Sequence, residues 1–330
     1  MENLVKENKY ILDVKDLKVS YHTYAGEVQS VRGVSFKVDR GEVLAIVGES
    51  GCGKSVTATS LIKLISEPGN IEAGEVIYMG RDILKENKNR LREIRGNEIS
   101  MIFQEPMSSL NPVLTIGEQM TETLRLHKTM SKKDAYNRAL NLIDKVGIPR
   151  GKEIIHSYPH QLSGGMLQRI MIAIAISCNP KLIIADEPTT ALDVTIQAQI
   201  LQLLKQVRDE FNTAIILITH DLGVVAEMAD NVAVMYAGKI IEKGTVVEIL
   251  VEPKHPYTDA LLKSKPIIGT KIDRLYSIKG HVPNLINMKE SCYFCDRCEK
   301  KIEICKNKIP ELTEVKNNHK VACWLNEEVN

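Results

Sequence analysis

Three short runs of almost purely apolar residues predict buried strands of a parallel sheet. They occupy residues 43–47, 182–185 and 214–219. A strand that is covered on both faces reads as a continuous apolar run, whereas a strand with one exposed face alternates apolar and polar residues. Such alternation is found between residues 17 and 42, in "SVRGVSFKV" for example, and it predicts short antiparallel strands.

A helical pattern occupies part of the stretch from about residue 105 to about residue 165. Within residues 132–151, apolar side chains recur at helical spacing, and Gly147 is a suitable stop. The pattern predicts a helical subdomain in this stretch. The longest nearly apolar run, residues 170–178, is about half as long as a bilayer span requires.

Composition excludes several classes of protein. The chain has 330 residues with a formal net charge of +1, which argues against a broad basic face for nucleic acid and against electrostatic adsorption to lipid. Its first residues, "MENLVKENKYILDV", lack the features of a secretory signal and predict a cytosolic protein. Four of its seven cysteines lie between residues 292 and 305. In a reducing compartment such clusters favour metal binding or redox chemistry over structural disulfides.

A phosphate-binding loop is predicted directly after the first apolar run, where "GESGCGKS" fits the pattern G-x-x-x-x-G-K-[ST]. Its glycines let backbone N–H groups surround phosphate oxygens at the start of a helix. Lys54 would reach the β- and γ-phosphates and Ser55 would bind Mg²⁺, while Cys52 is predicted to be a small filler. The predicted ATP contacts in this loop are Gly48, Ser50, Gly51, Cys52, Gly53, Lys54, Ser55 and Val56. The alternative, a glycine-rich turn that binds nothing, is less favoured because strand, loop and helix follow in the required order.

Polar groups also follow the second and third apolar runs. Asp186 and Glu187 end the second run, where one carboxylate can hold Mg²⁺ and its neighbour can polarise the attacking water. His220 follows the third run, and ligands bind at the carboxyl ends of parallel strands. The alternatives are a strand end that meets solvent and a structural histidine.

These motifs, together with "LSGGM" at residues 162–166, resemble the nucleotide-binding subunits of ATP-binding-cassette (ABC) transporters. The loop, "FQEP", "LSGGM", "LIIADE", "ALD" and "THD" occur in that family's order. The resemblance implies an α/β P-loop NTPase fold with a RecA-like core, an antiparallel β subdomain and an α-helical subdomain. It also implies an ATPase whose catalytic residues are Glu187 as general base, His220 as γ-phosphate switch, Gln104 as sensor of the attacking water, and Lys54.

The resemblance assigns further contacts to the nucleotide and its metal. Tyr21 would stack on adenine, with Tyr24 as the alternative, and Mg²⁺ would be held by Ser55, Gln104 and Asp186. Ser163 can cap a helix that starts with two glycines, which makes a second anion-binding helix start. By the resemblance, Ser163, Gly164, Gly165 and Asp193 would contact ATP held by a partner subunit. The alternative for "SGG" is a simple helix start.

Other segments resemble the ATPases of dipeptide and oligopeptide importers, namely "FQEPMSSLNPVLTIGEQM", "EPKHPYTDALLKSKP" and "IKGHVPNL". This likeness implies two transmembrane permease subunits, a second ABC ATPase (a paralogue or another copy), a peptide-binding protein outside the membrane, and a place at the cytoplasmic face. Nickel and glutathione importers share much of the pattern. Non-transport ABC ATPases and cassettes that do not hydrolyse ATP are further alternatives. His255-Pro256-Tyr257 is interpreted as a proline-stiffened turn.

The chain is predicted to divide into a cassette of residues 1–250 and a small metal-bound extension of residues 251–330. The tail, from about Lys271 onward, has few apolar residues for a core of its own, so a metal centre would stabilise it. Its pattern resembles the end of peptide-importer ATPases, which implies a 4Fe–4S cluster held by Cys292, Cys298, Cys305 and Cys323. Zinc, and free thiols or disulfides, are the alternatives. Cys295 lies outside the family pattern.

Overall fold

The three apolar runs form buried strands in the computed structural model: β3 (Val43–Val47), β7 (Leu182–Asp186) and β8 (Ala214–Ile218). Every residue of the three strands is buried. The sequence prediction of fully covered strands is therefore confirmed: apart from Asp186 at the end of β7, every side chain in these strands is apolar.

The structure describes residues 9–190, 192–264, 276–286, 288, 290–316 and 318–326, and these divide into two units. Unit 1 contains the described residues of Met1–Ile11, Asp39–Glu42 and Lys85–Ile218, and unit 2 contains those of Leu12–Val38, Val43–Leu84 and Thr219–Asn330. Each unit is thus built from separate stretches of the chain. The boundary at residue 250 stays a prediction.

Unit 1 contains the parallel strands β6 (Ile99–Ile102), β7 and β8, in that order. Residue pairs such as Ile99 with Leu182 and Leu182 with Ala214 set their register. Because the strands are parallel, the segments that follow β6 and β7 emerge at one edge of the sheet. The polar residues predicted after these strands lie on those segments.

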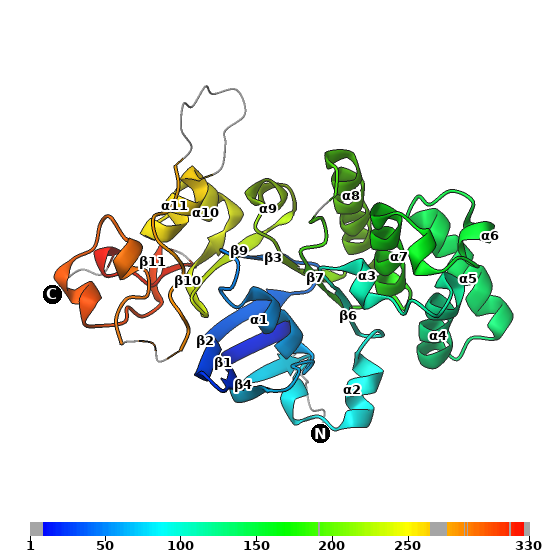
Figure 1. Cartoon of the computed structure of the whole chain (residues 1–330), viewed down its shortest axis with the longest axis horizontal. Helices are drawn as coiled ribbons and strands as arrows, with labels where there is room; N and C mark the ends of the chain where they lie inside the picture. Colours follow the sequence, from blue (N-terminus) through cyan, green and yellow to red (C-terminus); the bar gives the residue numbers. More distant parts are fainter. Residues whose placement is uncertain are drawn as a thin grey trace, which may run out of the picture. The chain divides into compact units, whose positions relative to one another are not determined.

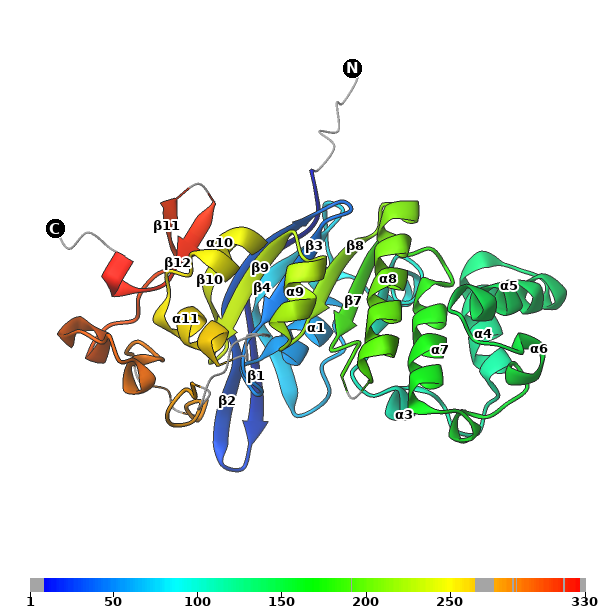
Figure 2. The same cartoon turned by 90° about the horizontal axis from the view of Figure 1, so that it is seen from above.

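Unit 1 also contains helices. They are α2 (Lys88–Ile94), α3 (Pro106–Ser109), α4 (Ile116–Lys128), α5 (Lys132–Lys145), α6 (Gly151–Ile154), α7 (Gly164–Ile176) and α8 (Val194–Phe211). Of these, α3 to α6 lie in the stretch that the sequence predicts to be helical; its grouping as a subdomain stays a prediction. Thr115 and Glu118 form a capping box at the start of α4, and Ser131 caps α5. Gly147 follows the end of α5 at φ +70°, as its predicted stop requires. Figure 2 shows α4, α5 and α6 gathered beside α7.

Unit 2 contains an antiparallel sheet in the order β2 (Gly26–Asp39), β1 (Tyr10–Thr23), β4 (Gly69–Tyr78) and β5 (Arg81–Asp82). The predicted strands were short, but β1 and β2 each span 14 residues. Gly33 lies inside β2 at φ +89°, so the break in the apolar alternation bends the strand without ending it.

A second set of strands in unit 2 starts from β3. It pairs in parallel with β9 (Asn231–Tyr236), which pairs antiparallel with β10 (Lys239–Thr245). β10 then pairs with β12 (His319–Val321), and β12 with β11 (Thr313–Lys316). The helices of this unit are α1 (Lys54–Leu61), α9 (Leu222–Met228), α10 (Val246–Val251) and α11 (Pro256–Lys263). The red end of the chain thus lies against the yellow β10 (Figure 1).

Described residues of the tail belong to the core of unit 2. Leu285 and Phe294 are buried in one cluster with Tyr236 and Tyr257. The backbone N–H of Gln29 on β2 also donates to the carbonyl of Leu285 (3.2 Å). The tail is therefore anchored by apolar packing and backbone hydrogen bonds, which the sequence interpretation had assigned to a metal centre.

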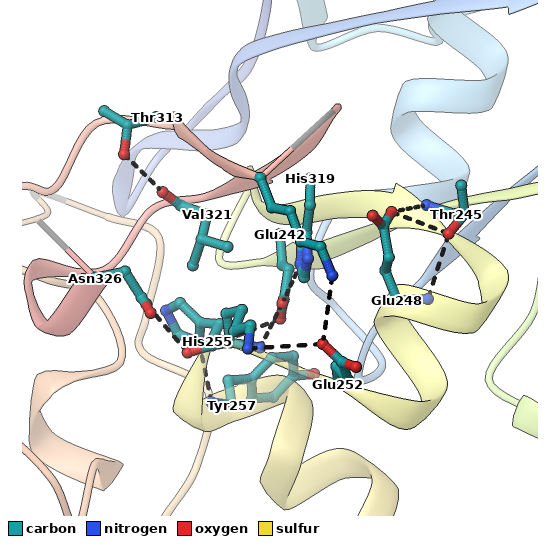
Figure 3. Close-up of polar contacts among 12 residues, drawn as sticks. Glu242, Thr245, Glu248, Glu252, His255, Tyr257, Thr313, His319, Val321 and Asn326 are labelled. Carbon is teal, nitrogen blue, oxygen red and sulfur yellow. Dashed lines mark hydrogen bonds and ion pairs between the residues drawn. The ribbon is translucent and has the colours of Figure 1, made fainter.

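A buried carboxylate joins β12 to the start of α11 (Figure 3). Glu242 on β10 is fully buried and accepts hydrogen bonds from the backbone N–H groups of Lys254 (2.6 Å) and His255 (3.1 Å). The Nε2 of His319, itself 1 % exposed, donates to the same carboxylate at 2.8 Å. Because a buried charge needs such partners, Glu242 fixes three segments in one arrangement.

Candidate active site

The predicted phosphate loop connects β3 to α1 in unit 2, and its backbone requires glycine at two positions. Gly48 has φ +155° and Gly53 has φ +100°. A Cβ atom at Gly48 would lie 2.3 Å from the carbonyl oxygen of Met235, and one at Gly53 would lie 2.3 Å from that of Ser30. Any side chain at either position would therefore collide with a neighbouring strand.

The loop leads into the N-terminus of α1, where Gly53 provides no side-chain cap. A helix start that follows a glycine-rich loop binds phosphate well, because its first N–H groups have no partner within the helix. The ammonium group of Lys54 donates to the carbonyl oxygens of Gly48 (2.9 Å) and Glu49 (3.0 Å). The side chain of Lys54 therefore lies along the loop in which it is predicted to contact the phosphates.

The remaining loop residues differ in exposure. Ser50, Gly51 and Ser55 are exposed, whereas Cys52 is fully buried. Burial raises the pKa of the Cys52 thiol, so it stays protonated at neutral pH. Both observations agree with a space-filling role for this cysteine.

In unit 1, the structure brings Gln104 and Glu187 together. The amide nitrogen of Gln104 donates to Glu187 Oε2 (3.1 Å), and the hydroxyl of Thr190 donates to the same oxygen (2.9 Å). Asp186, the residue before Glu187, is 4 % exposed at the end of β7. Two residues that are 83 positions apart thus meet at the carboxyl edge of the parallel strands.

The backbone of Glu187 has φ +47°, in the left-handed region that side chains rarely adopt. Its N–H donates to the carbonyl of Ile218 at 2.9 Å, which helps to hold this conformation. A non-glycine residue in this region costs about 1–2 kcal/mol, and such strain concentrates at functional sites. Glu187 is therefore placed by its surroundings and not by its own backbone preference.

The helix start at Ser163 has the predicted geometry. Ser163 Oγ accepts a hydrogen bond from the N–H of Met166 (3.4 Å), and α7 begins at Gly164. Ser163 and Gly164 are exposed, and a Cβ atom at Gly164 would meet no other atom within 4 Å. Within this unit, buried Gln168 of α7 donates to the carbonyl of Pro188 at 2.7 Å, which ties the helix to the segment after Glu187.

Three other predicted contacts lie at strand and helix ends. Asp193 is exposed and caps α8, accepting from the N–H of Ile196 (3.0 Å). Tyr21 is half-buried on β1, whereas Tyr24 is fully exposed. His220 is exposed between β8 and α9.

The cysteines of the tail gather in unit 2. The N–H of Cys292 donates to the carbonyl of Cys305 (2.9 Å). Burial, with the neighbouring thiols, raises the pKa of Cys292 to about 12 and that of Cys323 to about 11. In the part of the chain that the structure describes, no three His, Cys, Asp or Glu side chains converge on a position for a metal ion. The predicted metal-bound state of the extension, by iron–sulfur or by zinc, is therefore not supported by this geometry.

Sequence reasoning missed two contacts of Glu49, the second residue of the phosphate loop. Arg297 of the tail forms two hydrogen bonds with the Glu49 carboxylate (2.6 and 2.9 Å). The hydroxyl of Tyr257 accepts a hydrogen bond from the N–H of Glu49 (2.9 Å). His255-Pro256-Tyr257 forms the start of α11 and not the predicted turn: the Nδ1 of His255 caps the helix by accepting from the N–H of Tyr257, and Pro256 is the first helical residue. The only signal in the sequence was that Arg297 and Tyr257 lie in family-like segments without assigned chemistry.

Among the described residues, no helix has both the length and the apolar character that a membrane crossing requires.

Comparison with known families identifies two regions. Residues 31–190 match the family described as "ABC transporter". Residues 241–305 match the family described as "Oligopeptide/dipeptide transporter, C-terminal region". The second region contains Tyr257 and Arg297, the two residues that contact Glu49.

Curated relatives match over nearly the whole chain. The oligopeptide transport ATP-binding protein AppD of Bacillus subtilis (strain 168) is 52 % identical over 319 residues, which cover 96 % of this chain and 97 % of that protein. The dipeptide transport ATP-binding protein DppD of Lactococcus lactis subsp. cremoris (strain MG1363) is 50 % identical over 316 residues, covering 96 % and 90 %.

Solved structures share the fold. The dimeric ATP-binding cassette MJ0796 in a post-hydrolysis state with ADP and phosphate superposes with a TM-score of 0.65 at 27 % identity, covering 71 % of this chain and 98 % of that one. CbiO1 of Clostridium perfringens, part of an ABC transporter complex, gives a TM-score of 0.61 at 28 % identity, covering 74 % and 92 %.

Proposed function

We propose that this chain, which belongs to the ABC transporter family, hydrolyses ATP to power the uptake of dipeptides or oligopeptides through a membrane permease. The observation that carries this proposal is the 52 % identity to an oligopeptide transport ATP-binding protein over 96 % of the chain. That identity extends into the C-terminal region that is typical of oligopeptide and dipeptide transporters.

The reaction converts ATP and water to ADP and phosphate. The loop from Gly48 to Val56, with Lys54, would hold the phosphates, and Tyr21 would stack on adenine. Ser55, Asp186 and Gln104 offer the oxygen ligands that Mg²⁺ prefers, and the ion would neutralise charge on the phosphate oxygens. Glu187 would take the proton of the attacking water.

The pairing of Gln104 with Glu187 supports this assignment. The carboxylate accepts two hydrogen bonds, from an amide and a hydroxyl, and these hold its orientation. A general base has to be held within reach of the proton that it removes. His220 is proposed to contact the γ-phosphate, which is supported by its exposed position directly after β8.

The working form is proposed to be a dimer of such subunits, with two ATP molecules between them. Ser163, Gly164, Gly165 and Asp193 would contact the ATP that the partner holds. The exposed start of α7, which Ser163 caps, supports this because the first N–H groups of a helix favour an anion.

The other proposed partners are two transmembrane permease subunits and a peptide-binding protein outside the membrane. The second ATPase would be a paralogue or another copy of this chain. The subunit would then lie at the cytoplasmic face of the membrane, attached to the permease. Neither the chain's charge balance nor its composition favours nucleic acid as a partner.

A 4Fe–4S cluster on Cys292, Cys298, Cys305 and Cys323 is the proposed state of the tail, with zinc as the alternative. The four cysteines fit the family-like spacing, and Cys292 and Cys305 are joined through their backbones.

Uptake experiments test the transported substrate. In cells that lack this gene, the uptake of labelled dipeptides and of longer peptides is measured. The uptake of nickel and of glutathione is measured in parallel. Restoring the gene is expected to restore peptide uptake, whereas the gene carrying Lys54→Ala is not. Restoration of nickel or glutathione uptake alone would assign the chain to one of those importers.

A further inference from the structure

Glu49 is held at both its backbone and its side chain by residues of the C-terminal region. Its N–H donates to the hydroxyl of Tyr257 at 2.9 Å, and its carboxylate accepts two hydrogen bonds from Arg297 at 2.6 and 2.9 Å. Glu49 directly follows Gly48 in the phosphate loop. Contacts from residues more than 200 positions away therefore determine where one side of this loop lies.

Arg297 is itself fixed in place. Its side chain is only 6 % exposed, its Nε donates to the carbonyl of Lys279 (3.0 Å), and Nη1 also contacts the hydroxyl of Tyr236 (3.3 Å). Its backbone N–H donates to the carbonyl of Phe294 within the turn that carries Cys295. A guanidinium with all these partners and two parallel bonds to a carboxylate is a strong and directional pair.

Aromatic packing supports the same arrangement. The ring of Phe294 packs edge-on against Tyr236 and Tyr257, with ring centroids 5.4 Å apart in both pairs. Tyr236 and Tyr257 in turn lie 4.7 Å apart. The cysteine-rich turn and the two tyrosines that contact Arg297 and Glu49 thus form one buried cluster. The fold of the turn is therefore mechanically linked to the loop.

The carboxylate of Glu49 places a negative charge at the edge of the phosphate loop. A carboxylate at the edge of a phosphate-binding loop repels a polyanionic ligand unless a cation neutralises it. Arg297 supplies that cation through its two hydrogen bonds to the carboxylate, since an arginine guanidinium stays charged in proteins. Loss of Arg297 would leave a half-buried negative charge next to the phosphates.

We propose that Arg297 is a positioning residue for ATP hydrolysis: through Glu49 it holds the phosphate loop and cancels a negative charge at its edge. The folded cysteine-rich turn thereby sets the affinity for ATP. This inference rests on the proposed phosphate-binding role of the loop.

The test is ATP hydrolysis by the transporter assembled from its full-length subunits, with KM and kcat determined separately. Arg297→Gln is expected to raise KM for ATP about tenfold while kcat changes less than about threefold, because the half-buried charge of Glu49 is left without its partner. The increase in KM should shrink at high salt, since salt screens the exposed side of Glu49. Adding Glu49→Gln to Arg297→Gln should return KM to near the wild-type value.

Two further variants make the outcome decisive. Lys263→Ala removes an exposed ion pair with Asp259 in the same unit and is expected to leave KM and kcat unchanged. Arg297→Lys keeps the charge but not the two parallel bonds, so it should give a smaller increase in KM. It also serves as the test if Arg297→Gln does not fold.

If Arg297→Gln lowers both the melting temperature and kcat, and Glu49→Gln does not restore KM, Arg297 has only a structural role and the proposal is overturned. An unchanged KM in both Arg297 variants would also overturn it. Lys54→Ala separates this failure from failure of the proposed function. If Lys54→Ala leaves nucleotide binding intact, the loop itself has been wrongly assigned.

Discussion

At the scale of single residues, Glu187 combines a strained backbone with a well-ordered carboxylate. Its φ of +47° is unfavourable for a side chain with a Cβ atom, yet its N–H and its Oε2 atom both have partners in the same unit. The surrounding contacts outweigh a local cost of about 1–2 kcal/mol. A residue held in this way is suited to a task that depends on orientation.

Glu187→Gln is predicted to slow ATP turnover about 10²–10⁴-fold, because a general base contributes a factor of that size. The amide has nearly the same shape, so ATP binding should be retained. Turnover is measured by phosphate release, and binding by a fluorescent nucleotide.

Thr190→Val provides the control at the same site. It removes one of the two hydrogen bonds to the Glu187 carboxylate but leaves the carboxylate itself. It should lower turnover by much less than Glu187→Gln does. Wild-type turnover in Glu187→Gln would refute the assignment of the general base.

At the scale of one element, the start of α11 depends on a neutral histidine. His255 caps the helix through Nδ1, which accepts from the N–H of Tyr257 and therefore has to be unprotonated. Burial lowers its pKa from 6.5 to about 3. The folded chain thus keeps this side chain neutral at pH values where the unfolded chain protonates it.

The sign of the pH effect follows from proton binding. Between pH 6.5 and pH 3 the unfolded state binds the proton and the folded state does not, so this residue makes the protein less stable as the pH falls. From pH 7 to pH 5 the free energy of unfolding should fall by about 2 kcal/mol on this account.

His255→Asn tests this, because asparagine also caps helices but does not titrate. Urea unfolding at pH 7 and pH 5 should show a smaller loss of stability in the variant than in the wild type. Equal losses in both proteins would show that His255 is not responsible for the pH dependence.

At the scale of the whole molecule, the tail is attached to the rest of unit 2 by three kinds of contact. Leu285 and Phe294 enter its buried cluster, His319 pairs with Glu242, and Arg297 pairs with Glu49. None of these contacts is made by a cysteine side chain. A metal centre would therefore add to an existing attachment.

The metal content of the purified protein tests the cluster directly. Protein purified without oxygen is predicted to contain iron and sulfide and to absorb visible light, and Cys298→Ser should lower its iron content. Because the other contacts remain, we expect the melting temperature of the metal-free protein to fall by only a few degrees, as for a loss of about 1 kcal/mol in a domain of this size. A colourless, iron-free sample that contains zinc would show that the tail binds zinc and not the cluster. A sample without metal would rule out both.

The sequence by itself determined the elements and the loop geometry that depend on neighbouring residues. Apolar runs predicted β3, β7 and β8, because continuous burial requires continuous apolar sequence. The spacing of Gly48 and Gly53 predicted the phosphate loop, and Ser163 predicted the start of α7, because both depend on local backbone geometry.

Only the tertiary structure decided which distant residues meet. Arg297 and Glu49 are 248 positions apart, and nothing in either segment specifies the other. The same holds for His319 with Glu242, 77 positions apart, and for the strained conformation of Glu187. Such pairs arise from the packing of whole segments, whose free energy is distributed over many contacts, so no local pattern records them. The sequence thus identified the loop, and the fold revealed that the tail holds it.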